Sequence, residues 1–132
     1  MVSWINSWKL CLNFSGRTSR EEFWTFVLWN VIVWSSVLFW IELIIIGSDG
    51  WDIRPHHIIP GFIGCSVVYC LLTILPVLSI TARRLHDIGK SGWNVMLFFT
   101  PPPIGLMVLS YWLIQPGLPN DNAYGKALDA AL

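Results

Sequence analysis

Four of the 16 charged residues of this 132-residue chain lie within eleven consecutive positions, in the sequence RRLHDIGKSGW. They are Arg83, Arg84, Asp87 and Lys90, and His86 lies among them. Guanidinium and ammonium groups bind phosphates and carboxylates, whereas an imidazole beside a carboxylate can transfer protons or hold a metal ion. The stretch therefore indicates an anion-binding surface, a reaction centre or a polar turn between two buried helices.

A catalytic interpretation of this stretch rests on His86 and Asp87 alone. Two adjacent residues do not make a metal site, and the other histidines, His56 and His57, are expected on the opposite side of a membrane. The letters GKS resemble part of a phosphate-binding loop, but that pattern requires glycine where this chain has Arg84. We therefore expect no enzyme, cofactor or metal site, and keep as an alternative a small membrane enzyme that uses His86 and Asp87.

A second basic cluster lies in the sequence SGRTSREEFW, residues 15–24. Thr18 or Ser19, each followed three positions later by glutamate, can form the capping box that starts a helix. Arg17 and Arg20 would then lie at a helix N-terminus, where the helix dipole disfavours cations. An anionic lipid phosphate could bind both guanidinium groups. The alternative is that these arginines only orient the chain in a membrane.

The composition points to lipid as the main solvent of the chain. It is 55% hydrophobic and only 12% charged, whereas soluble domains are about 25% charged. The formal net charge is zero, which argues against a nucleic-acid partner, because such proteins carry clustered positive charge. A chain of this length is expected to form one domain, here a single membrane domain over residues 1–132.

Three long hydrophobic runs, residues 23–46, 58–80 and 93–114, predict three transmembrane segments. The first would extend ~36 Å as a helix, enough to cross a ~30 Å hydrocarbon core. The runs lack the alternation of barrel strands, and only helices and closed barrels satisfy their backbone groups in lipid. The fold class is therefore an all-α integral membrane protein.

The third segment contains Pro101–Pro103, which remove three consecutive backbone donors from its middle, so a helix there must be broken or kinked. A kinked helix that still spans would send the tail, residues 115–132, outside the cell. A re-entrant hairpin would return the tail to the cytoplasm. We expect the kinked span, because re-entrant backbone needs protein to shield it and three segments offer little.

Residues 1–15 predict a short helix that lies in the membrane interface. Trp4, Ile5, Trp8, Cys11 and Leu12 recur at a helical spacing and make one face apolar. The alternative is a frayed leader that gains order only from the membrane.

Lys and Arg residues set the expected orientation. Residues 1–22 and 81–92 contain six of them, and residues 47–57 and 115–132 contain two. The N-terminus and the RRLHD stretch are therefore expected in the cytoplasm, in a protein that crosses the membrane several times. Inside the runs, Asn30, Thr73 and Ser79 are expected to form hydrogen bonds between helices.

Taken together, the motifs resemble the domain of unknown function 805 family of small bacterial inner-membrane proteins. The resemblance rests on SGRTSREEFW before the first run, RRLHDIGKSGW before the third, PPPIG within it and PGLPNDNAYG after it. The family positions carried over are Gly16, Arg17, Arg20, Phe23 and Trp24, then Arg83, Arg84, Leu85, His86, Asp87, Gly89, Ser91, Gly92 and Trp93, then Asn122, Tyr124 and Gly125. Family members often continue with Asp-Pro after the tyrosine and glycine, which this chain lacks. The resemblance implies a topology and a location but no activity.

The function expected from the sequence is a non-enzymatic membrane protein with a basic cytoplasmic rim. This rim would bind anionic phospholipid headgroups or a membrane protein partner through Arg17, Arg20, Arg83, Arg84, His86, Asp87, Lys90 and Trp93. Asp87 would hold His86 or an arginine in place. An alternative is a subunit of a transport or channel assembly, which would require oligomerisation because three spans cannot enclose a pathway.

Overall fold

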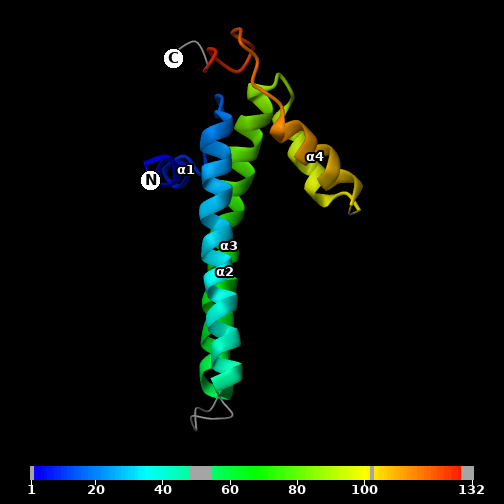
Figure 1. The fold of residues 1–132 in the computed structure, drawn as a ribbon. Helices are drawn as coiled ribbons and strands as arrows, with labels where there is room; N and C mark the ends of the chain where they lie inside the picture. The colour runs from blue at the N-terminus through cyan, green and yellow to red at the C-terminus, as the bar shows by residue number, and fades with distance from the viewer. Residues whose placement is uncertain (1, 48–54, 102, 129–132) are drawn as a thin grey trace. The chain divides into compact units, whose positions relative to one another are not determined.

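The structure, a computed structural model, describes residues 2–47, 55–101 and 103–128 (Figure 1). Its elements are helices α1 (Val2–Lys9), α2 (Arg20–Gly47) and α3 (Pro55–Asp87), the 3-10 helix η1 (Gly92–Phe99) and helix α4 (Ile104–Ile114). Within the described ranges the only β pairing is an isolated bridge between Asn122 and Gly125. The chain is thus helical, as expected. It divides into two compact units, Met1–Phe26 with Leu75–Leu132, and Val27–Ile74.

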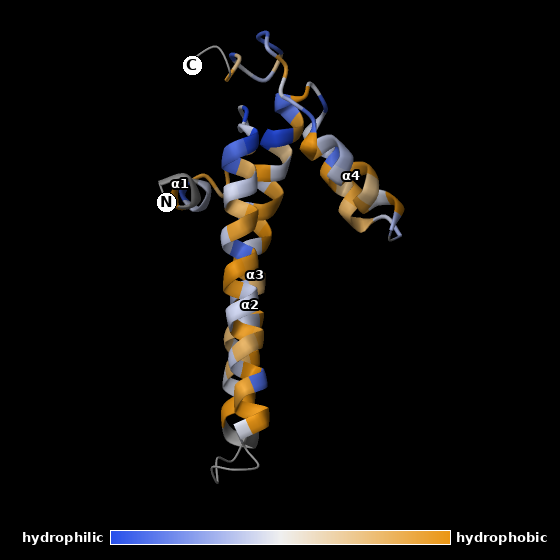
Figure 2. Cartoon of the chain, in the orientation of Figure 1, coloured by the Kyte–Doolittle hydropathy of each residue, from blue (hydrophilic) through white to orange (hydrophobic). Residues whose placement is uncertain are grey.

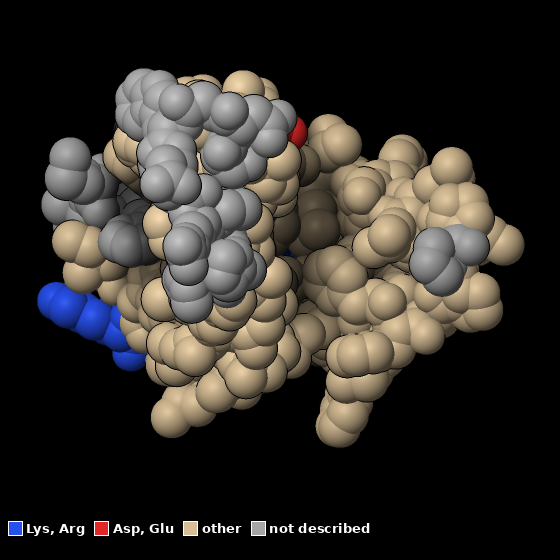
Figure 3. Space-filling view, turned by 90° about the horizontal axis from the view of Figure 1, so that it is seen from below, with Lys and Arg blue, Asp and Glu red and all other residues tan. Residues whose placement is uncertain are grey.

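Helices α2 and α3 are the two that are long and apolar enough to cross a membrane. In their most apolar stretches only 6% of α2 and 22% of α3 is buried, whereas the core helix of a soluble protein would be mostly buried. Hydrophobic residues follow both helices along most of their length (Figure 2), and the face seen in Figure 3 shows few charged side chains outside its grey parts. These exposed apolar surfaces fit a lipid environment.

The ends of the long helices carry the polar residues. Ser19 caps α2, because its Oγ accepts a hydrogen bond from the Glu22 amide at 3.2 Å. Helix α3 does not end with the apolar run at residue 80 but continues through the RRLHD sequence to Asp87. Gly89 then turns the chain with a φ of 74°, and Ser91 caps η1. The basic stretch is therefore the polar end of a helix followed by a turn.

In the unit Val27–Ile74, a polar pair joins α2 to α3. The Tyr69 hydroxyl donates to Asn30 Oδ1 at 2.8 Å, and the ring of Trp34 meets the Tyr69 ring edge-on. The expected bond between helices is thus present at Asn30. Thr73 instead bonds the Tyr69 carbonyl of its own helix.

The segment 93–114 is not one kinked helix, as we had expected, but two short helices in contact with each other, η1 and α4. Gly105 allows their close approach, because a Cβ there would overlap the side chain of Thr100. Helix α4 has 11 residues, so it is about 16 Å long and too short to span. The helix is interrupted here because prolines lack the backbone N–H groups that would continue it.

The residues before α2, which we call the leader, form hydrogen bonds with α3. Helix α1 ends at Lys9, shorter than the helix of residues 1–15 that the sequence predicts. The buried hydroxyl of Ser79 lies 3.0 Å from the Leu10 carbonyl and 2.7 Å from the Asn13 carbonyl. Thr18 also donates its amide to the Arg83 carbonyl. These bonds contradict a frayed leader, and the partners of Ser79 are in the leader rather than in another long helix.

Candidate functional site

The last turns of α3 are buried although they are polar. Every residue from Ser79 to Asp87 is buried, including two arginines, a histidine and an aspartate. Burial of a charge costs free energy unless it is paired and hydrogen-bonded. The site is therefore defined by the partners of these side chains.

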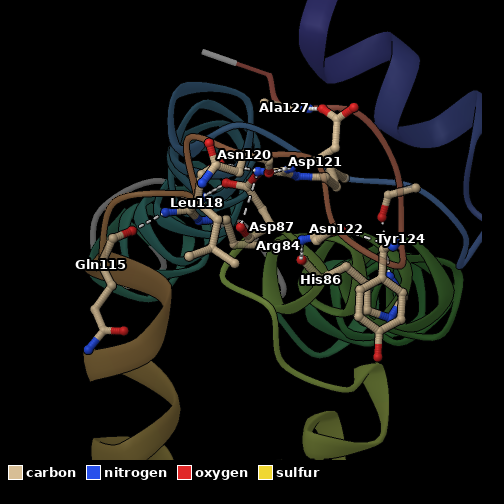
Figure 4. Close-up of polar contacts among 12 residues, drawn as sticks. Arg84, His86, Asp87, Gln115, Leu118, Asn120, Asp121, Asn122, Tyr124 and Ala127 are labelled. Atoms are coloured by element: carbon tan, nitrogen blue, oxygen red, sulfur yellow. Dashed lines mark hydrogen bonds and ion pairs between the residues drawn. The ribbon is translucent and has the colours of Figure 1, made fainter. Parts of the chain in front are cut away.

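The Asp87 carboxylate accepts hydrogen bonds from two arginines. Arg17, three residues before α2, donates its Nε to Asp87 Oδ1 at 2.8 Å. Arg84, one turn earlier on α3, donates Nη1 to Asp87 Oδ2 (Figure 4). The side chains of Arg17, Arg84 and Asp87 are at most 4% exposed. We call these three residues the Asp87 clasp.

The other N–H groups of these two guanidinium groups donate hydrogen bonds to main-chain carbonyls later in the sequence. Arg84 bonds the carbonyls of Leu113 and Gln115, at the end of α4. Arg17 bonds the carbonyls of Leu118 at 2.6 Å and Asn120 at 3.0 Å, both in the tail. The clasp therefore joins the leader, the end of α3, the end of α4 and the tail.

The clasp contains two positive charges and one negative charge. The remaining positive charge is met by carbonyl groups at two helix C-termini, since Arg17 Nη2 also bonds the Asp87 carbonyl and Arg84 bonds the end of α4. A helix C-terminus carries a partial negative charge. This dense set of bonds is what makes a buried ion pair tolerable.

Gly117 allows the tail to pass close to the clasp. A Cβ at Gly117 would overlap the Asp87 carboxylate. The next residue donates its amide to the Asp87 carbonyl, from Leu118 N at 2.9 Å. Glycine is therefore required at this position by the close approach of the tail to Asp87.

His86 has a separate set of partners. Its Nδ1 lies 3.2 Å from the Gly16 carbonyl, which can only accept, so Nδ1 carries a proton. The Tyr124 ring stacks on the imidazole with 3.8 Å between ring centroids (Figure 4). Asn122 holds the tyrosine in place, because it donates to the His86 carbonyl and accepts from the Tyr124 amide. The tail thus covers His86.

His86 lies beyond the apolar run of α3. Burial lowers the pKa of His86 below its ordinary value of 6.5, and the hydrogen bond to Gly16 opposes this shift. The imidazole is therefore neutral near pH 7, and its Nε2 carries a lone pair. A Cβ at Gly92 would lie 2.8 Å from this Nε2, so Gly92 keeps space open beside it.

A cavity of about 590 Å³ opens on this side of His86. Its apolar walls are provided by Phe14 in the leader, Leu78 and Ala82 on α3, and Trp93 and Met96 on η1. Its polar groups belong to His86, Ser91 and Tyr124. The cavity lies within the unit that contains both helix ends and the tail.

The other cations predicted at this site lie outside the clasp. Arg20 is exposed and donates to the Ile114 carbonyl at 3.4 Å, and the Lys90 ammonium lies over the Trp112 ring at 4.2 Å. Arg83 is only 6% exposed, and its Nε has no hydrogen-bond acceptor among the described residues. Burial lowers the pKa of Arg83, and nearby Glu22 opposes this shift.

The sequence predicted these residues to share one site, and the structure divides them into separate environments. Asp87 bonds two arginines, whereas His86 bonds the Gly16 carbonyl. In the described part of the chain, no three His, Cys, Asp or Glu side chains group as metal ligands would. Trp93 is 80% exposed at the rim of the cavity.

Sequence reasoning missed two features of the site. The first is the carbonyl acceptors of the clasp, which leave no signal in side-chain types. The second is the stacking of Tyr124 on His86, for which the turn-rich sequence PGLPNDNAYG was a signal. We had expected this tail outside the cell, so it was not assigned to the site.

Comparison with known proteins gives a family without an assigned function. Residues 11–126 match the family described as "Protein of unknown function (DUF805)". Inner membrane protein YhaI of Escherichia coli K12 is 37% identical over 126 residues, covering 96% of this chain and 94% of that protein. Inner membrane protein YhaH of the same strain is 32% identical and covers 86% of this chain and 85% of its own length. No solved structure matches.

These relatives are named for their location, and their names indicate no enzymatic activity. An inner-membrane location agrees with the two long apolar helices. By the extent of the match and by the identity to its relatives, the chain belongs to the DUF805 family.

Proposed function

We propose that this protein is a non-enzymatic, multi-pass protein of the inner membrane that binds an anionic phospholipid headgroup at its cytoplasmic end. The six Lys and Arg residues in 1–22 and 81–92, against two in the other connections, support a cytoplasmic N-terminus. Residues 23–46 and 58–80 are the spanning parts. The polar ends of α2 and α3 then lie at the inner leaflet, where anionic headgroups are found.

In this arrangement the hairpin of η1 and α4 enters the inner leaflet and returns. Each of its helices is about 16 Å long, close to half of a ~30 Å hydrocarbon core. Its outer surface is apolar, with Phe99, Ile104, Met107 and Tyr111 all more than 60% exposed. Such a surface is suited to contact with acyl chains.

The headgroup proposal rests on one observation, the burial of Arg83 without an acceptor for its Nε among the described residues. It is a buried guanidinium whose Nε lacks an acceptor, and it makes no ion pair within the described ranges. An arginine is always charged, and an unmet buried donor costs about 1–3 kcal/mol. A lipid phosphate oxygen would supply the missing acceptor.

The position of Arg83 suggests which other residues take part. The Arg83 carbonyl accepts a hydrogen bond from the Thr18 amide at 3.2 Å, which brings Arg83 close to the start of α2, where the exposed Arg20 lies. Arg20 and Arg83 are therefore the proposed headgroup ligands. Arg17 and Arg84 are left out, because carboxylate and carbonyl oxygens already take their donors.

Native mass spectrometry of the purified protein tests this proposal, with phosphatidylglycerol and phosphatidylethanolamine of the same acyl chains as probes. Arg83→Gln is expected to reduce phosphatidylglycerol binding about tenfold or more, since a hydrogen bond to a charged group contributes about 1.5–3 kcal/mol. Lys9→Gln removes an exposed cation on α1 and is the matched control. Equal phosphatidylglycerol binding by both variants would refute the role of Arg83.

A further inference from the structure

The cavity beside His86 differs chemically from the proposed headgroup site. None of its lining residues is Lys, Arg, Asp or Glu. The charged residues of the Asp87 clasp are paired with one another. A phosphate in this cavity would therefore lose its hydration without gaining a cation, which is costly. The occupant that fits is uncharged.

The walls of the cavity are suited to a hydrocarbon chain. Its apolar lining and its volume of about 590 Å³ are those of a small-molecule site, which is usually 300–1,000 Å³ and mostly apolar. The exposed Trp93 at its rim is a residue that favours the boundary between headgroups and acyl chains.

Two polar groups in the cavity remain available to a ligand. His86 donates its Nδ1 proton to Gly16, so Nε2 is an acceptor. Tyr124 lines the cavity, and its phenol points toward the start of η1 in Figure 4. A hydroxyl group can donate to the first and accept from the second at the same time, whereas an ether or ester oxygen can only accept.

We infer that this cavity binds a neutral membrane lipid with a free hydroxyl group, of the diacylglycerol class, with the hydroxyl between His86 Nε2 and the Tyr124 phenol. One acyl chain lies along Leu78, Ala82 and Met96. The other chain remains in the bilayer. This site is independent of the headgroup proposal, since it uses neither Arg20 nor Arg83.

A matched pair of tyrosine variants tests the inference. Tyr124→Phe removes the hydroxyl and keeps the ring that stacks on His86, whereas Tyr111→Phe removes an exposed hydroxyl on α4. The probe is dioctanoylglycerol, added to the purified full-length protein and followed by native mass spectrometry. Tyr124→Phe is expected to weaken binding about threefold to tenfold, because it deletes one hydrogen bond, and Tyr111→Phe to leave binding unchanged.

Two further probes define the ligand chemistry. The methyl ether of dioctanoylglycerol lacks the hydroxyl proton and is expected to bind the unmodified protein as weakly as dioctanoylglycerol binds Tyr124→Phe. Arg83→Gln is expected to retain dioctanoylglycerol binding even where it loses phosphatidylglycerol, which separates the two sites. Equal binding of alcohol and ether, equal behaviour of the two tyrosine variants, or no binding of dioctanoylglycerol would overturn the inference.

Discussion

Arg17 Nε donates to Asp87 Oδ1 at 2.8 Å, which fixes the residues before α2 to the last residue of α3. The two residues are 70 positions apart, so the chain between them includes both long helices. Among the described residues, Asp87 is the carboxylate in both ion pairs, with Arg17 and with Arg84. The stability of this end of the protein is therefore expected to depend on that single acid.

Asp87→Asn is expected to destabilise the protein by about 3–5 kcal/mol, because it leaves two buried guanidinium groups without a counter-charge. Thermal unfolding in detergent, followed by circular dichroism at pH 7.5, measures the effect. Glu21→Gln removes an exposed carboxylate from the first turn of α2 and is expected to cost less than about 1 kcal/mol. Similar losses for the two variants would show that the clasp does not stabilise the fold.

Gly117→Ala is expected to detach the tail, because the new Cβ would overlap the Asp87 carboxylate. Limited proteolysis of the tail should become faster, and the unfolding temperature should fall. Gly64→Ala is the control, since a Cβ at Gly64 within α3 meets no atom within 4 Å. A helical Gly→Ala change of this kind is expected to be neutral or to stabilise by up to about 1 kcal/mol. Undiminished protection of the tail in Gly117→Ala would contradict the role given to Gly117.

The hairpin predicts that both of its ends face the cytoplasm. The substitutions Ser91→Cys and Asp121→Cys, both at exposed positions, are made one at a time in a variant whose three native cysteines are replaced. Both are expected to react with a membrane-impermeant maleimide only after the cells are opened. A cysteine at Ser48, in the connection expected outside, is the opposite control. Labelling of Asp121 from outside intact cells would show that residues 93–114 span the membrane.

His86 is expected to make stability depend on pH. Its pKa in the folded protein lies below the ordinary value of 6.5, so the unfolded chain binds a proton more readily between these two pKa values. The free energy of unfolding should therefore fall as the pH decreases below about 6.5 and level off below the folded pKa. His86→Gln, which cannot titrate, should show a smaller fall over the same range in unfolding measurements at pH 7.5 and 5. An equal fall in both proteins would assign the pH dependence to other groups.

The sequence predicts the parts of the fold that depend on continuous hydrophobicity and local caps. The runs 23–46 and 58–80 lie within α2 and α3, because crossing a membrane needs about 20 apolar residues in a row. Ser19, one of the two cap residues expected before the first run, caps α2, because a cap depends on a residue only three positions away. The break at the prolines was also predictable.

The path of the chain after this break was not predictable, because the length of the run 93–114 suits a spanning helix as well as two half-length helices. What distinguishes them lies elsewhere, in the bonds from Arg84 to Leu113 and Gln115. The sequence also could not show that Arg17 and Arg84 turn inward, since their acceptors are main-chain carbonyls that every residue has. Whether an arginine can bind a ligand depends on whether its donors already have acceptors in the folded protein, and that information is tertiary.

The order of synthesis gives the clasp a consequence for biogenesis. Four of the carbonyl acceptors of Arg17 and Arg84, between Leu113 and Asn120, belong to a part of the chain that leaves the ribosome after α2 and α3. In the proposed topology, these two guanidinium groups are still hydrated cations while the long helices insert, and they help to retain the flanking residues in the cytoplasm. We therefore expect each arginine to contribute first to the orientation of the nascent chain and, once the tail has formed its bonds, to the stability of the folded protein.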